Sequence, residues 1–142
     1  MAGAAGADPV REFTSDEAAQ LLPVITPFLE RLRSLHQALA RVNAEIDELT
    51  AKLSEGNGYP VEELRAQLET LTDRQLEQVR EFEATAREIE EHGCLLKDPE
   101  IGLVDFYARR SGALVFLCWQ LGEPAIQYWH TLDGGFASRR PV

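Results

Sequence analysis

The sequence predicts an α+β protein in which a long antiparallel helical hairpin, resembling a coiled coil, is followed by a small three-stranded antiparallel β-meander. Three observations predict this class: an unbroken heptad pattern early in the chain, a glycine- and proline-containing turn after it, and a change to strand-like composition near residue 102. The chain has 142 residues. This length suits one domain, expected over residues 12–142, preceded by a disordered tail at residues 1–11.

The first helix is expected to begin directly after Thr14, because Thr14 and Glu17 have the spacing of a capping box. Its apolar residues then recur in alternating steps of four and three, which is the seam of a packed helical hairpin. Pro23 and Pro27 remove backbone donors from the first turns, so we expect a kink near residues 19–27 or a short separate first helix. The seam comprises Leu21, Ile25, Phe28, Leu32, Leu35, Leu39, Val42, Ile46, Leu49 and Leu53.

A second helix is expected after the segment Ser54–Pro60, SEGNGYP, whose glycines, asparagine and proline predict a turn. Gly93 suits the left-handed cap at its end. The apolar seam of this helix contains one eight-residue step that Gln75 divides in two, a stutter that locally unwinds a supercoil. Because the connection is short, the helices should lie antiparallel over residues 15–93.

The last third of the chain is rich in Val, Phe, Trp, Tyr and Ile, and predicts strands at about 102–107, 113–119 and 125–131. The sequences RRSG and LGEP supply the turns between them. The meander therefore spans about residues 102–132, followed by a tail at residues 133–142. It should cover the apolar base of the first helix.

The charge distribution excludes several classes of partner. The net charge is −10, with 10 basic and 21 acidic residues in residues 1–104, against 4 and 3 in residues 105–142. An acidic body disfavours nucleic acids and anionic membranes as partners. No apolar run approaches a membrane span, and the opening residues lack the pattern of a signal peptide. Cys94 and Cys118 form no CxxC pair, so we expect free thiols in the cytoplasm.

Asp105, Cys118, Glu123 and His130 form the candidate functional cluster on the predicted sheet. A mixed set of thiol, imidazole and carboxylate suits zinc or iron. Whether these side chains meet depends on the register of the strands. In the structural alternative, Cys118 is a small buried hydrophobe and His130 bonds to a carbonyl or to Asp133.

A nucleophilic pair is a second chemical possibility. Cys118 would need His130 within hydrogen-bond reach, with Asp105 or Asp133 orienting the imidazole. A thiol in the middle of a strand is, however, usually buried and unreactive.

The segment Leu117–His130, LCWQLGEPAIQYWH, is interpreted mainly as a structural plug with one polar corner. That corner would comprise Glu123, His130 and an arginine from the sequence SRRP. Arg139 or Arg140 is the expected partner of Glu123. The same arginines are candidates for contacts with an anion or with an acidic helix of a partner.

The motifs KDPEIGLVDF, LCWQLGEPAIQYWH and LDGGFASRRP, together with the opening FTSDEAAQLLP, resemble a bacterial family of uncharacterised proteins, domain-of-unknown-function family 2203. The resemblance extends from about Phe13 to Pro141. It implies a small bacterial protein of long helices and a short sheet, and it implies no activity.

Two classes of function remain open. The long seam favours a non-enzymatic, self-associating interaction or scaffold protein, which we expect to be a homodimer. An additional, unidentified protein partner is left open. The alternative is a metal-binding protein or an enzyme with a zinc or iron site on the C-terminal sheet.

Overall fold

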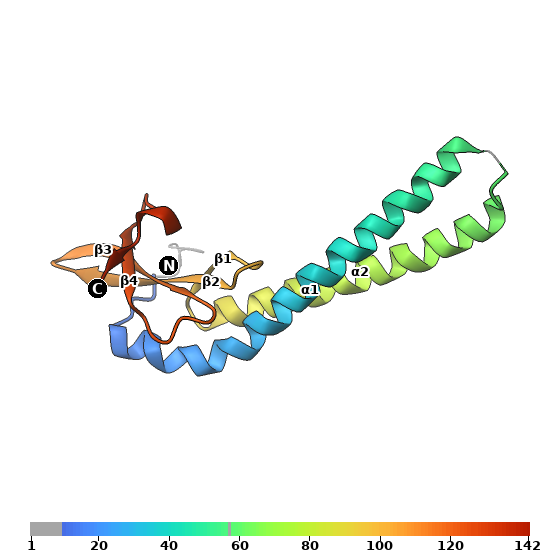
Figure 1. Cartoon of the computed structure of the whole chain (residues 1–142). Helices are drawn as coiled ribbons and strands as arrows, with labels where there is room; N and C mark the ends of the chain where they lie inside the picture. Colours follow the sequence, from blue (N-terminus) through green and yellow to red (C-terminus); the bar gives the residue numbers. More distant parts are fainter. Residues whose placement is uncertain (1–9, 57) are drawn as a thin grey trace, which may run out of the picture.

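The computed structural model describes residues 10–56 and 58–142, and most of the chain expected as a tail, residues 1–9, lies outside the described residues. Two long helices, α1 (Ser15–Glu55) and α2 (Val61–Glu91), form the predicted antiparallel hairpin. An antiparallel sheet follows them. Figure 1 shows the sheet lying over the first turns of α1, while the remainder of the hairpin extends away from it as a two-helix arm.

The sheet has five strands, so the prediction of three was wrong. Its order follows the chain, and each strand pairs with the next. The strands are β1 (Leu95–Asp98), β2 (Leu103–Arg110), β3 (Ala113–Gln120), β4 (Tyr128–Thr131) and β5 (Arg140–Pro141), with a short 3₁₀ helix, η1 (Phe136–Ser138), before the last one. The additional strands are the two edges, which are short and carry no alternating apolar pattern by which they could be recognised.

The start of α1 is fixed by the predicted capping box. The Thr14 side chain accepts a hydrogen bond from the backbone of Glu17, whose carboxylate accepts one from the backbone of Thr14. Phe13 is buried, its backbone N–H donates to the carbonyl of Tyr107, and its ring meets Phe106 edge-on. The residue preceding the cap thus attaches the helix to β2.

Pro23 and Pro27 lie inside α1, which is one continuous helix, so a separate first helix does not form. Figure 1 shows α1 bending between the part below the sheet and the arm. Both prolines are exposed, as expected where a helix curves with its convex side toward solvent. Leu21, Leu22 and Ile25 pack into the core that also contains Val115 and Trp119, as a bend toward the sheet requires.

The arm has its own small core, centred on Leu49, Leu64 and Leu71. At the predicted stutter, the Gln75 side chain donates to Oδ1 of Asn43 on α1, with the two atoms 2.6 Å apart. A polar pair therefore replaces an apolar layer where the heptad pattern is interrupted. Neither helix contains a segment of sufficient length and apolarity to span a bilayer.

The helix-facing side of the sheet forms the main core. Trp119 is 3% exposed there, and its indole N–H donates to the carbonyl of Glu123 in the turn after β3. Gly93, two residues after the end of α2, has φ of +99°, and a Cβ there would lie 2.6 Å from Cδ of Arg11 and 3.0 Å from the ring of Phe13. The positive φ confirms that this glycine ends the helix as predicted, and the chain then enters β1 at Leu95.

We expect Trp119→Ala to lower the free energy of unfolding by about 3–5 kcal/mol, because it leaves a cavity in the core and an unpaired carbonyl. Trp129→Ala should cost less, since Trp129 is only partly buried. Chemical denaturation of both variants measures the difference. Equal stability of Trp119→Ala and the parent protein would contradict this assignment of the core.

Candidate metal centre

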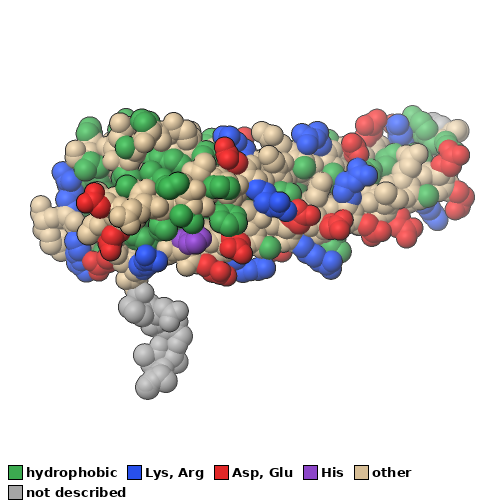
Figure 2. Space-filling view, turned by 90° about the horizontal axis from the view of Figure 1, so that it is seen from below, with side chains coloured by type: hydrophobic (Ala, Val, Ile, Leu, Met, Phe, Trp, Pro, Cys, Tyr) green, Lys and Arg blue, Asp and Glu red, His purple; other side chains and the backbone are tan. Residues whose placement is uncertain are grey.

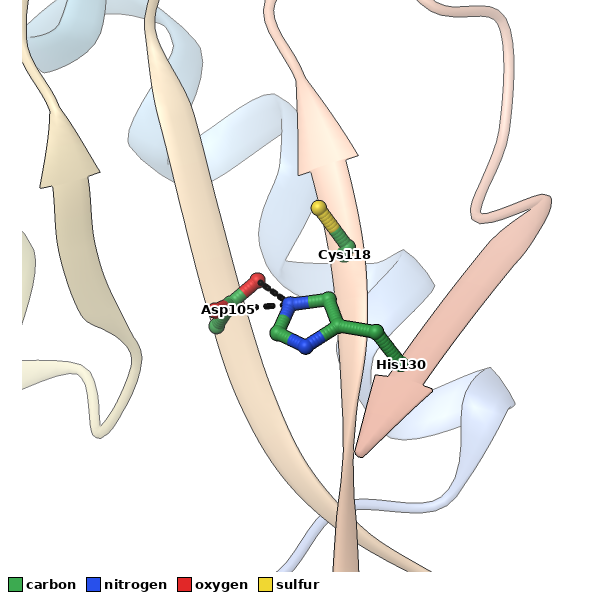
Figure 3. A group of neighbouring side chains, drawn as sticks. All are labelled: Asp105, Cys118 and His130. Carbon is green, nitrogen blue, oxygen red and sulfur yellow. Dashed lines mark hydrogen bonds and ion pairs between the residues drawn. The ribbon is translucent and has the colours of Figure 1, made fainter. Parts of the chain in front are cut away.

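The two faces of the sheet have different chemistry. Residues directly opposite each other on paired strands share a face. Val104, Phe106, Leu117 and Trp119 face the helices and belong to the apolar core. The intervening residues, including Asp105 and Cys118, point to the other face. The polar cluster therefore lies on the side of the sheet away from the helices, as Figure 3 shows.

Strand register brings three of the four candidate residues together. Asp105 of β2 is directly opposite Cys118 of β3, and Phe116 of β3 is directly opposite His130 of β4. Cys118 and His130 therefore share a face, the point that the sequence left open. Asp105, Cys118 and His130 are all buried, at 2%, 0% and 3% exposure respectively.

His130 has an acceptor at each ring nitrogen. Nδ1 lies 2.7 Å from the backbone carbonyl oxygen of Thr131, and Nε2 lies 3.1 and 3.2 Å from the carboxylate oxygens of Asp105. A carbonyl only accepts, so Nδ1 carries a hydrogen and donates it to Thr131. Nε2 and the carboxylate then need a cation between them, either a shared proton or a metal ion.

Cys118 completes the group. The pKa of its thiol is raised to about 12, mainly because the side chain is buried. The charge of Asp105 and a hydrogen bond to that carboxylate raise the pKa further. One donor atom from each of Asp105, Cys118 and His130 can be chosen so that all three lie within 4.8 Å of one another. Among the residues that the structure describes, this is the group with the spacing of a metal site.

The arrangement does not provide a cysteine nucleophile. A catalytic cysteine needs a lowered pKa and a histidine that accepts its proton. Both nitrogens of His130 instead face the oxygens of Thr131 and Asp105, and the pKa of Cys118 is raised.

Glu123 forms a second polar group with Arg139. One carboxylate oxygen accepts from the Arg139 guanidinium and the other from the backbone N–H of Gln120, 2.7 Å away. Arg139 is held between the rings of Tyr128 and Phe136. The expected partner of Glu123 is therefore Arg139. The predicted polar corner, in contrast, is divided, because His130 pairs with Asp105 rather than joining Glu123.

The other arginines of the two doublets, in RRSG and SRRP, have partners elsewhere. Arg140 and Arg110 each lie over the ring of Trp129. Arg109 forms an ion pair with Glu12. Asp133, considered as a partner of His130, is exposed.

Lys97 is the residue that the sequence did not single out. Its ammonium nitrogen lies 4.0 Å from an oxygen of Asp105 and 4.7 Å from the centre of the Phe116 ring. The sequence signal was weak, because Lys97 follows the helix end in a segment that reads as a loop. Only the pairing of β1 with β2 places it beside the cluster.

Comparison with known proteins assigns the chain to a family. The chain belongs to the DUF2203 family. The model of this family of uncharacterized conserved proteins matches residues 11–142, nearly the whole chain, and confirms the resemblance seen in the sequence motifs. No curated protein and no solved structure matches the chain.

We expect Cys118 to be unreactive in the folded, chelator-treated protein. At neutral pH, a pKa of about 12 lowers the thiolate fraction about a thousandfold relative to an ordinary cysteine. Iodoacetamide labelling of a Cys94→Ser variant, with and without denaturant, follows this thiol alone. Equally fast labelling in both states would contradict the raised pKa.

Proposed function

We propose that the chain is a metal-binding protein whose metal ion, zinc in the first instance, is held by Asp105, Cys118 and His130. The observation that carries this proposal is the hydrogen bonding of His130, in which Nδ1 donates to the Thr131 carbonyl while Nε2 faces a carboxylate. A metal-ligating histidine commonly has this pattern, since a backbone carbonyl fixes the tautomer and leaves the other nitrogen for the metal.

The donor set and its spacing support zinc. Thiolate, imidazole and carboxylate are all zinc ligands, and the mixed set is also compatible with iron. Bonds of about 2.0–2.3 Å in a tetrahedron place ligand atoms about 3.3–3.7 Å apart. The oxygens of Asp105 already lie 3.1 and 3.2 Å from Nε2 of His130. All three ligand atoms lie within 4.8 Å of one another, so the set would draw together by about 1 Å around a bound ion.

Electrostatics favour a divalent ion at this position. A carboxylate and a thiol buried in the sheet are costly to ionise without a compensating charge. Zinc would neutralise the carboxylate of Asp105 and would take the place of the proton that Cys118 otherwise retains. The ion would also link β2, β3 and β4, so binding should stabilise the folded sheet.

We expect the chelator-treated protein to bind one zinc ion. Asp105→Asn, Cys118→Ser and His130→Gln should each weaken binding by more than the roughly 10–100-fold that is usual for the loss of an outer partner of a metal ligand. Metal analysis and competition with a chromophoric chelator measure stoichiometry and affinity. Cobalt(II) should give a thiolate-to-metal absorption band that Cys118→Ser abolishes.

Cys94→Ser is the matched control for these variants. Cys94 is also buried, with a pKa raised to about 11 mainly by burial, but its thiol contacts the carbonyl of Ile89. This variant should keep the affinity and the cobalt spectrum of the parent. Because binding displaces the Cys118 proton below its pKa of about 12, affinity should rise about tenfold per pH unit from that proton alone. A folded parent protein that binds neither ion would refute the proposal.

Self-association through the helical arm is a second candidate function, corresponding to an interaction or scaffold role in a homodimer. The arm consists of two helices that pack only on each other. Beside its core, Ile46, Leu53 and Leu68 are therefore only partly buried. Leu76 of α2 is 50% exposed. Figure 2 also shows hydrophobic side chains gathered over the first half of α1, where Val24 is 43% exposed. A four-helix arrangement of two arms would cover the first of these surfaces.

We expect sedimentation equilibrium at micromolar concentration to give the mass of a dimer. Leu76→Gln should weaken the dimer, because it removes an exposed apolar group from the arm. Val24→Gln, at a site of similar exposure away from the arm, should leave the dimer unchanged. A monomer mass for the parent protein would exclude this candidate, and sensitivity to Val24→Gln alone would move the interface to the first half of α1.

A further inference from the structure

The edge strand β1 contains an irregularity beside the candidate metal centre. Leu96 pairs with Val104, and Asp98 pairs with Leu103, so the register shifts and Lys97 is the extra residue between two paired positions. Such a bulge redirects a side chain and is frequent next to functional sites. Here the bulged residue is Lys97, and its ammonium group lies near the cluster, on the face of the sheet that carries Asp105.

The ammonium group lies at the boundary between the buried cluster and solvent. It is 4.0 Å from Asp105 and 4.7 Å above the ring of Phe116, whose centroid lies 5.4 Å from that of His130. The side chain of Lys97 is 40% exposed, whereas the side chains of Asp105 and His130 are 3% exposed. Lys97 therefore lies between the buried candidate ligands and solvent.

The protein supplies three ligands to this centre among the residues that the structure describes. Structural zinc sites are almost always closed by four protein ligands, whereas sites with three leave a position for a water or an exogenous ligand. Glu123 does not fill the fourth position, because both of its oxygens are used by Arg139 and Gln120. When Asp105 binds the ion through one oxygen, the fourth position is left to a ligand from solution.

The charge balance determines what kind of ligand fits. A divalent ion bound to one carboxylate and one thiolate is neutral, and Glu123 and Arg139 neutralise each other. Lys97 then leaves one positive charge beside the centre. Its closest acidic partner, Asp105, would be shared with the metal. Although Lys97 is partly exposed and its charge is partly screened, a positive group beside a neutral centre favours an anion over a neutral water molecule.

We propose that the metal ion takes a small oxyanion, such as the carboxylate group of a small acid, as its fourth ligand, and that Lys97 binds this anion. The inference rests on the proposed metal site. The ligand must be small, because the metal-binding side chains are almost completely buried. Lys97 would pair with the anion through a charge-assisted hydrogen bond, and the metal would bind another of its oxygens.

Titration of the cobalt(II)-loaded chain of residues 1–142 with acetate tests this inference. Acetate should change the visible cobalt spectrum saturably, whereas chloride at equal ionic strength should not reproduce that change. Lys97→Gln should retain cobalt binding but lower the affinity for acetate at least about tenfold, because it removes the charge-assisted contact.

Lys52→Gln is the matched control. Lys52 and Lys97 are the two lysines of the chain, and Lys52 lies on the arm near Glu48. This variant should bind acetate like the parent protein. A cobalt-loaded protein whose spectrum is insensitive to acetate would overturn the inference while leaving the metal site intact. Equal acetate affinity in Lys97→Gln would exclude the role of Lys97, and a protein that binds no metal would refute both proposals.

Discussion

The contact between Asp105 and His130 imposes the strictest requirement on this fold. A carboxylate and an imidazole are buried together in the sheet, with exposures of 2% and 3%, and each would be costly to bury alone. Their contact requires β2, β3 and β4 to pair in one register, because a shift of one residue would turn either side chain toward the helices. The polar group thus specifies the same strand alignment that the apolar core needs.

Alternation along the strands explains why the aromatic segment Leu117–His130 serves two purposes. Trp119 and Trp129 point toward the helices and contribute to the core. Cys118 and His130, each adjacent to one of these tryptophans, point to the opposite face. The interpretation of the segment as a structural plug therefore holds for one face, where packing dominates. The other face carries a separate chemical group whose residues contribute little apolar surface to the helices.

The sequence predicted those features that depend on local periodicity. The heptad seam, the cap at Thr14 and the glycine at residue 93 each follow from spacing or backbone conformation, and all were found. The edge strands β1 and β5 could not be predicted, because four and two residues are too few to show a pattern. Of the four residues predicted for the candidate site, three lie together and Glu123 does not join them. Glu123 pairs with Arg139 instead, whereas Lys97, which was not predicted, lies beside Asp105. Strand pairing and the bulge in β1, rather than proximity in sequence, decide which side chains meet.

The position of the cluster on the face without helices also bears on its chemistry. Beneath α1, the same three residues would be enclosed by apolar side chains, and no charged residue could reach both them and solvent. On the face away from α1 and α2, Lys97 of the edge strand β1 lies beside them and stays partly exposed, and Arg139 lies over the ring of Tyr128, which is directly opposite Cys118. Long side chains of this kind keep their stems on apolar surface and their charges near water. The sheet therefore separates two physical tasks: its helix-facing side provides stability, and its other side combines buried polar side chains with the partly exposed Lys97 at their edge. The helical arm extends away from both sides of the sheet.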